Sequence, residues 1–177
     1  MILNSAETEK NGLEQVAALM CVAARTAPKT KGRDNLVTLI VTGDDLKALS
    51  AELMNVARDT SSLFFERDAK CVDASQAVVL LGQRNAQARL PACGFCGFED
   101  CEACIKAGGM CALNACDIGI ATCAAAAVAA RHYVDNRIMF TIGRAALNLS
   151  LFGDESVTMA YGIPLSVSGK SPFFDRK

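Results

Sequence analysis

One short segment, residues 93–111, holds five of the nine cysteines of this 177-residue chain. It reads CGFCGFEDCEACIKAGGMC, so the spacing is C-x2-C-x4-C-x2-C-x6-C. Thiolates this dense in one loop need a shared partner, and the usual partners are an iron–sulfur cluster or zinc. The segment therefore predicts a metal centre whose ligands come from Cys93, Cys96, Cys101, Cys104 and Cys111.

Two orders of iron–sulfur ligands can be drawn from these cysteines. The C-x4-C-x2-C…C order of plant-type [2Fe–2S] ferredoxins is matched by Cys96, Cys101, Cys104 and Cys111, although the plant pattern places its last cysteine further away. The C-G-x-C-G-x-x-x-C…C motif of small [4Fe–4S] domains in electron-transfer subunits is resembled by Cys93, Cys96, Cys101 and Cys111. We favour the [4Fe–4S] order, with Cys104 as the fifth candidate.

Zinc is the alternative metal. Cys93 with Cys96 and Cys101 with Cys104 form two C-x2-C pairs, and an all-cysteine zinc site needs two such pairs. A gap of four residues is short for two facing zinc knuckles, and it leaves Cys111 without a role. We therefore rank an iron–sulfur cluster above zinc.

Composition excludes several classes of function. The net charge is −1 and no basic stripe is present, so we expect no nucleic-acid partner. The longest apolar run, residues 118–130, is too short to cross a bilayer, and the opening MILNSAETEK turns polar too soon for a signal peptide. We expect a cytoplasmic protein, in which nine cysteines favour metal binding or redox chemistry over disulfides.

Hydrophobic periodicity predicts a layered fold. We expect helices at 5–25, 44–58, 113–133 and 144–152, and strands at 37–41, 77–81 and 157–163. Ser5 is the predicted N-cap of the first helix, and Gly153 is predicted to end the last helix. Pro164 is predicted to end the last strand. This order indicates one α/β or α+β domain, 1–177, with a cysteine-rich loop at 91–112.

The helix at 113–133 is rich in alanine, which is typical of a central or dimer-interface helix. Cys116 and Cys123 share one of its faces, and we expect both in the core. Asp117 interrupts the apolar face, so it should have a polar partner. His132 is expected at the surface near the end of the helix.

Several motifs together resemble an uncharacterised prokaryotic family of proteins containing a ferredoxin domain. They are the cysteine loop, RTAPKTKGRDN, DIGIATCAAAAVAA, VDNRIMFTIGRAA and GIPLSVSGKSPFFDR. The resemblance extends from about Leu13 to Arg176.

A more distant resemblance is to the FMN-dependent nitroreductase-like superfamily. The superfamily has a segment of helix, A-P-S-x-x-N-x-Q-P-W and strand, and ARTAPKTKGRDNLVTLIVTGDD is similar to it. Residues 117–130 are similar to its central helix, and YGIP is similar to its closing strand. The resemblance implies an α+β nitroreductase-like layered fold with an inserted cysteine loop, and a homodimer that binds FMN between its subunits. The superfamily's N-terminal arginine motif has no counterpart, because residues 1–11 contain no Arg.

The resemblance also implies which cations would hold the FMN phosphate. Lys170 and Arg176 match the basic residues of the superfamily's tail. The basic loop supplies Arg25, Lys29 and Lys31, which could replace the missing arginine motif. The cysteine loop predicts an iron–sulfur redox protein, and the resemblance implies an FMN-dependent oxidoreductase. The alternatives are an electron carrier or redox sensor without flavin, and a structural zinc protein.

Overall fold

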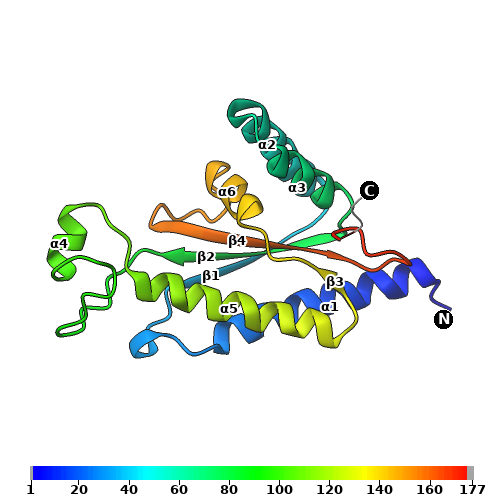
Figure 1. The fold of residues 1–177 in the computed structure, drawn as a ribbon. Coiled ribbons are helices and arrows are strands. Elements are labelled where there is room, and N and C mark those ends of the chain that lie inside the picture. The colour runs from blue at the N-terminus through cyan, green and yellow to red at the C-terminus, as the bar shows by residue number, and fades with distance from the viewer. Residues whose placement is uncertain (1, 175–177) are drawn as a thin grey trace.

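The computed structural model describes residues 2–174, and Figure 1 shows their arrangement. The elements in chain order are α1 (Ser5–Thr26), η1 (Thr30–Gly32), β1 (Leu36–Val41), α2 (Asp44–Thr60), α3 (Leu63–Asp73), β2 (Ala77–Arg84), α4 (Cys101–Lys106), α5 (Ala112–Arg131), β3 (Asp135–Asn136), α6 (Phe140–Asn148) and β4 (Val157–Ser166).

An antiparallel sheet in the order β1-β2-β4-β3 lies between two helical layers. Successive strand residues point to opposite faces, so Val79 and Leu81 pack with α1 and α5. Val78 and Leu80 pack on the other face with α2, α3 and α6. Figure 1 shows the two layers on opposite sides of the sheet. The predicted α+β class is confirmed, because helices cover a sheet that is antiparallel throughout.

Helix α1 begins one residue earlier than its predicted cap implies. Asn4, not Ser5, is the N-cap: its side-chain oxygen accepts a hydrogen bond from the Glu7 amide at 2.9 Å. The Glu7 carboxylate in turn accepts from the Asn4 amide at 3.3 Å. Asn4 is the N-cap because Glu7 lies three residues later and completes a capping box with it. The predicted apolar stripe is confirmed as buried: Leu13, Val16, Ala17, Met20 and Ala24.

The outer face of α5 differs from the prediction. Cys116 and Cys123 are both exposed, so the expectation that they pack in the core is wrong. The buried face of the helix is formed instead by residues such as Ile118, Ala121 and Ala125. Because α5 is apolar on every side, its sequence pattern could not show which side faces the sheet.

Segments read as irregular in the sequence contain regular structure. Residues 63–73 form α3, where only mixed core contacts were expected. Strand β4 continues through Pro164, the predicted end, to Ser166. Gly162 directs its N–H and C=O to Met139 on the β3 side. Because the backbone N–H groups of a strand alternate between its two sides, the Pro164 nitrogen faces that same side. There the short β3 pairs with Leu165 and Ser166, so the missing N–H of Pro164 costs the sheet no hydrogen bond.

Helix α6 begins and ends four residues before the predicted helix of 144–152. Gly143, which was read as part of an irregular segment, lies inside α6. A Cβ at this position would lie 1.9 Å from the backbone oxygen of Ala160 in β4. The glycine is therefore required by the close approach of α6 to β4, and it does not interrupt the helix.

The cysteine-rich segment extends beyond one end of the sheet. The chain leaves β2, forms the short α4 and enters α5, and Figure 1 shows α4 with its flanking loops at this end. By length and composition alone α5 could cross a membrane, but here it packs against α1, β2 and β4. Its apolar character is accounted for by this packing on one side.

Candidate functional site

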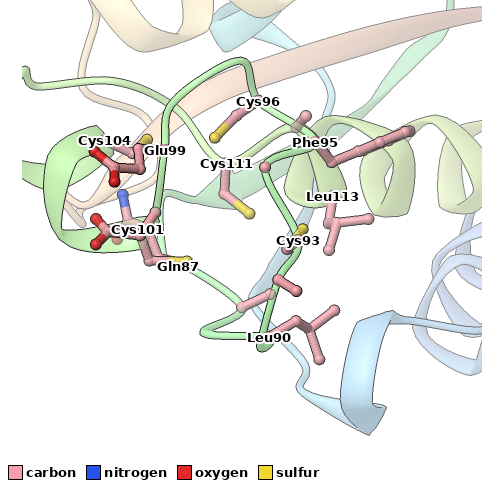
Figure 2. Close-up of a pocket in the computed structure, with 15 residues that line it drawn as sticks. Gln87, Leu90, Cys93, Phe95, Cys96, Glu99, Cys101, Cys104, Cys111 and Leu113 are labelled. Atoms are coloured by element: carbon pink, nitrogen blue, oxygen red, sulfur yellow. The ribbon is translucent and has the colours of Figure 1, made fainter.

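All five cysteines of the predicted metal centre line one pocket, shown in Figure 2. Its walls come from the connector after β2, the loop of residues 92–100, α4 and the first turn of α5. Cys104 and Cys111 are buried, whereas the other three thiols are half-buried. The pocket contains about 450 Å³ of space not filled by atoms, part of it open to solvent. The structure therefore brings together every thiol that the sequence assigned to this site.

Local sequence explains how α4 presents its two cysteines. Asp100 caps the helix, because its carboxylate accepts a hydrogen bond from the Ala103 amide at 2.7 Å. Cys101 and Cys104 are three residues apart and so lie on one side of this single turn. The helix is followed by Gly108 in the left-handed conformation, at φ +64°. The turn after Gly108 leads the chain directly to Cys111.

A set of side-chain amides fastens this segment to the end of β2. Asn85 donates to the Gly109 carbonyl at 3.1 Å, and its oxygen accepts from the Cys111 amide at 3.4 Å. The oxygen of the buried Asn114 accepts from the Ala86 amide at 2.9 Å. These contacts hold the pocket wall against the sheet. The sequence prediction missed them, because the connector QRNAQARL carries no pattern that distinguishes it from a solvated loop.

The Cys104 thiol has the most perturbed electrostatic surroundings in the pocket. Burial raises its pKa, and a hydrogen bond with Cys96 and the nearby Cys111 raise it further. A hydrogen bond from the Gln87 amide acts in the opposite direction. The net shift is upward, so this thiol needs a bound cation beside it to become a stable thiolate.

The five thiols share one pocket but are not placed as the ligands of a single metal ion. Across residues 2–174, no group of three or more His, Cys, Asp or Glu side chains is arranged to hold a single metal ion. His132 is exposed at the C-cap of α5, as predicted. The pocket lies at the opposite end of this 20-residue helix, about 30 Å away at 1.5 Å per residue. The histidine is therefore far from the pocket, whereas Glu99 and Asp100 line it beside the thiols.

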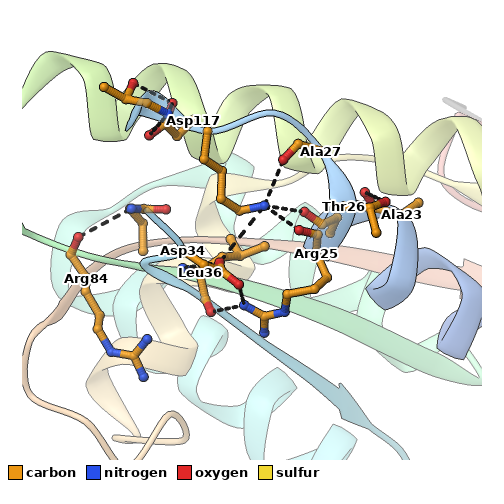
Figure 3. Close-up of polar contacts among 12 residues, drawn as sticks. Ala23, Arg25, Thr26, Ala27, Asp34, Leu36, Arg84 and Asp117 are labelled. Carbon is orange, nitrogen blue, oxygen red and sulfur yellow. Dashed lines mark hydrogen bonds and ion pairs between the residues drawn. The ribbon is translucent and has the colours of Figure 1, made fainter. Parts of the chain in front are cut away.

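The basic loop after α1 is built around Lys29. Figure 3 shows this region, with Arg25, Asp34 and Leu36 labelled. The Lys29 ammonium donates to the carbonyls of Ala24, Arg25 and Ala27 at 3.1, 2.6 and 2.9 Å. Its side chain is only 6% exposed, and Asp34 lies 4.0 Å from it. Lys29 thus supplies the cation that satisfies the last carbonyls of α1.

Arg25 is engaged in the same place. Its guanidinium donates to the Asp34 carboxylate at 2.6 Å and to the Leu36 carbonyl at 2.7 Å. Burial acts to raise the pKa of Asp34, but the hydrogen bonds from Arg25 and the Leu36 amide and the charges of Arg25 and Lys29 outweigh it, so that pKa is lowered. Both cations therefore connect α1 to β1.

The other predicted phosphate ligands lie elsewhere. Lys31 is exposed within η1 and has a left-handed backbone at φ 57°. Lys170 is exposed on the segment that follows β4. Arg176 lies outside the described residues. The structure therefore does not gather Arg25, Lys29, Lys31 and Lys170 around one pocket in the way that it gathers the cysteines.

Asp117 has the polar partner that the sequence required. It is 5% exposed, and its carboxylate accepts from the Thr30 amide at 3.0 and 3.1 Å and from the Thr30 hydroxyl at 2.9 Å. This contact fixes η1 to the second turn of α5. The basic loop is thereby held beside the end of the helix that borders the cysteine pocket.

Replacing Lys29 tests its structural role. We expect Lys29→Met to lower the free energy of unfolding by about 2 kcal/mol, since hydrogen bonds to charged groups contribute about 1.5–3 kcal/mol. Lys31→Met is the matched control, and as a surface change it should stay within about 0.5 kcal/mol of the natural protein. Urea unfolding followed by circular dichroism measures both. Equal stability of the two variants would contradict the assignment of Lys29 to the helix end.

The fold resembles solved nitroreductases. A nitroreductase with bound FMN from Desulfitobacterium hafniense superposes with a TM-score of 0.62 at 13% identity, covering 89% of this chain and 79% of that one. The FMN-dependent nitroreductase NfnB from Mycobacterium smegmatis, in complex with NADPH, gives a TM-score of 0.57 at 12% identity, covering 90% and 81%. At these identities the likeness shows a shared fold, as the sequence resemblance implied.

Sequence comparison shows the family. Residues 107–176 match the family model described as "Uncharacterized protein containing a ferredoxin domain (DUF2148)". A protein from Archaeoglobus fulgidus, described as uncharacterized, is 38% identical over 184 residues, which cover 99% of this chain and 98% of that protein. The chain therefore belongs to the family of uncharacterised proteins that contain a ferredoxin domain.

Proposed function

We propose that this chain is an iron–sulfur redox protein whose cluster is bound by four of the five thiols in the pocket at the start of α5. The observation that carries the proposal is the pocket itself, which five cysteines line within one short segment. Cys96, Cys101 and Cys111 are common to both ligand orders, and Cys93 or Cys104 completes the set. When bound, the cluster supplies one-electron transfer, and the family's ferredoxin domain agrees with this chemistry.

The number and spacing of the thiols favour a cluster over zinc. An all-cysteine zinc site would use two C-x2-C pairs, and the four residues between Cys96 and Cys101 are few for two facing zinc knuckles. A cluster is larger than an ion and needs a cavity with sulfur on several sides. We favour [4Fe–4S] over [2Fe–2S] because of the C-G-x-C-G-x-x-x-C pattern.

Helix α5 contributes to the electrostatics of the site. Cys111 is its N-cap, and Ala112 and Leu113 of its first turn line the pocket. The N-terminus of a 20-residue helix carries a partial positive charge, which stabilises a bound group of net negative charge. Four thiolates around iron and sulfide form such a group. The N-terminus of a long helix therefore borders the pocket, which supports the proposal.

A second candidate function adds a flavin. The Desulfitobacterium hafniense nitroreductase, which shares this fold, has FMN bound. The residues here fit FMN incompletely, because Arg25 and Lys29 are engaged at the end of α1. Phosphate binding would then fall to Lys31, Lys170 and Arg176. A flavin-dependent oxidoreductase therefore ranks below an electron carrier or redox sensor without flavin.

We further propose that the protein is a cytoplasmic homodimer. The exposed face of α5 carries Ile120, which is 45% exposed, together with the two exposed cysteines. Leu19 and Val22 of the adjacent α1 are 46% and 57% exposed. These side chains form an apolar face on the α1–α5 layer, and a second copy of the chain would cover it.

The visible spectrum of protein purified without oxygen tests the proposed function. We expect a broad absorbance that dithionite bleaches, as for an iron–sulfur protein. Additional resolved flavin peaks would favour the second candidate. A colourless protein with one zinc per chain would overturn both, and it would leave the structural zinc protein as the remaining interpretation.

A further inference from the structure

Strand β1 forms one edge of the sheet, because β2 is its one neighbouring strand among residues 2–174. The Arg84 amide of β2 donates to the Asn35 carbonyl at 2.9 Å. In an antiparallel pair, residues that bond to the neighbouring strand alternate with residues that face away from it. The N–H and C=O groups of Leu36, Thr38 and Ile40 therefore point to the free edge, away from β2.

The first position of this edge is closed by side chains. Arg25 donates to the Leu36 carbonyl at 2.7 Å, and the Asp34 carboxylate accepts from the Leu36 amide at 3.3 Å. Figure 3 labels these three residues at the start of the strand. Side chains can bond the backbone of Leu36 because β2 does not use it, which agrees with the direction given by the pairing.

The next two positions of the edge, Thr38 and Ile40, are open. No backbone hydrogen bond within residues 2–174 reaches their outward groups. The Ile40 side chain is 41% exposed, so this end of the strand is accessible. The strand reads LVTLIV, which is apolar and rich in β-branched residues. An apolar edge strand with unpaired backbone groups is a template for the addition of another strand.

We propose that this edge binds β1 of a second copy of the chain, in an antiparallel pair that joins the two four-stranded sheets. The closed position at Leu36 selects the register. Both open positions of each strand are used only when Thr38 of one copy lies opposite Ile40 of the other. Each residue offers one N–H and one C=O, so this register forms four backbone hydrogen bonds. Leu39 then lies opposite Leu39 of the second copy.

The charges beside β1 favour a second copy as the occupant. Arg33 lies six residues before Leu39 and Asp45 six residues after it, and both are exposed. An antiparallel pair centred on Leu39 brings the start of one strand to the end of the other, so each Arg33 approaches the Asp45 end of the second copy. The nearer acids, Asp34 and Asp44, already have ion pairs in their own chain. Opposite charges at both ends therefore favour this direction and register.

This edge is a separate surface from the α1–α5 face. Chains that use both surfaces in a closed assembly form tetramers, whereas chains that use the β1 edge alone form dimers. In either case, loss of pairing at the edge halves the mass of the assembly. A dimer held by the α1–α5 face alone would keep its mass.

The first experiment compares Thr38→Pro with Thr38→Val by analytical ultracentrifugation over a series of protein concentrations. Proline removes the outward N–H at this position and leaves the bonds to β2 in place, and edge strands tolerate it. We expect Thr38→Pro to have half the mass of the natural assembly and Thr38→Val to keep the natural mass. Equal masses for the natural protein and Thr38→Pro would overturn the proposal, and so would a natural protein that is monomeric.

A second variant guards against misfolding of Thr38→Pro. Ile40→Lys changes a side chain that is already 41% exposed, and lysine on an edge strand opposes strand addition. This variant should also have half the natural mass, while circular dichroism should show the native helix content. The full natural mass in a folded Ile40→Lys variant would contradict pairing at this edge.

The second experiment exchanges charges to identify the occupant. Arg33→Glu should weaken self-association about 2- to 30-fold, which is the range for two exposed ion pairs. The double variant Arg33→Glu/Asp45→Arg should restore the natural affinity, because it reverses both members of each pair. A double variant as weak as Arg33→Glu would overturn this register. A monomeric protein that instead binds a foreign extended peptide at β1 would overturn the second copy as the occupant.

Discussion

We expect Cys111→Ala to bind no iron–sulfur cluster, with iron content and visible absorbance both at background after anaerobic reconstitution. Cys111 is 6% exposed in the pocket and belongs to both ligand orders. It also connects the cysteine segment to α5 as the N-cap, and its amide bonds to Asn85. No neighbouring thiol of the segment can take this position at the helix start. Iron analysis and the visible spectrum measure the effect.

Cys123→Ala is the matched control for this experiment. Cys123 lies on the exposed side of α5, nearly three turns beyond the last pocket residue, Leu113, and should not affect the cluster. The control variant should therefore bind as much iron as the natural protein. Full iron content in Cys111→Ala, or equal loss in both variants, would contradict the assignment of the pocket as the cluster site.

The second large effect is expected at Gly143, where α6 meets β4. A methyl group there would lie 1.9 Å from the Ala160 oxygen and 2.3 Å from its carbonyl carbon. Both are backbone atoms of an inner strand, so they cannot rotate away. We expect Gly143→Ala to lose more than about 3 kcal/mol of stability, since overpacking of cores costs about 1–3 kcal/mol even where side chains can adjust. Urea unfolding measures the loss.

Gly119→Ala provides the comparison within another helix. Gly119 lies in α5, and a Cβ there would have no heavy atom within 4 Å. Alanine is a better helix former than glycine, so this change should raise stability by about 0.5–1 kcal/mol. A small effect at Gly143, similar to that at Gly119, would show that α6 does not approach β4 as closely as described.

The features that the sequence predicted well depend on local spacing. Successive cysteines three to seven residues apart must lie near one another in any fold, so their common pocket followed from the sequence alone. The stripe of α1 was also predictable, because polar residues on its other side define its buried face. The need of Asp117 for a partner followed from a charge on an apolar helix, although Thr30, 87 residues away, could not be named.

The features that were missed depend on contacts between distant segments. Gln87 and Asn85 act on Gly109, which lies more than twenty residues further along the chain. Nothing in their local sequence sets them apart from surface amides. Lys29 looked like a phosphate ligand because it lies in a loop with several cations, but its ammonium folds back on the end of α1. The direction of the side chain decides whether a loop lysine binds a ligand or the backbone, and the sequence composition does not show that direction.

The most direct test of the central claim is the ratio of iron, acid-labile sulfide and zinc to protein in the natural chain purified without oxygen. The proposed [4Fe–4S] centre predicts about four iron and about four sulfide atoms per chain, with no stoichiometric zinc. One zinc per chain without sulfide, or a protein that binds neither metal after reconstitution, would contradict it.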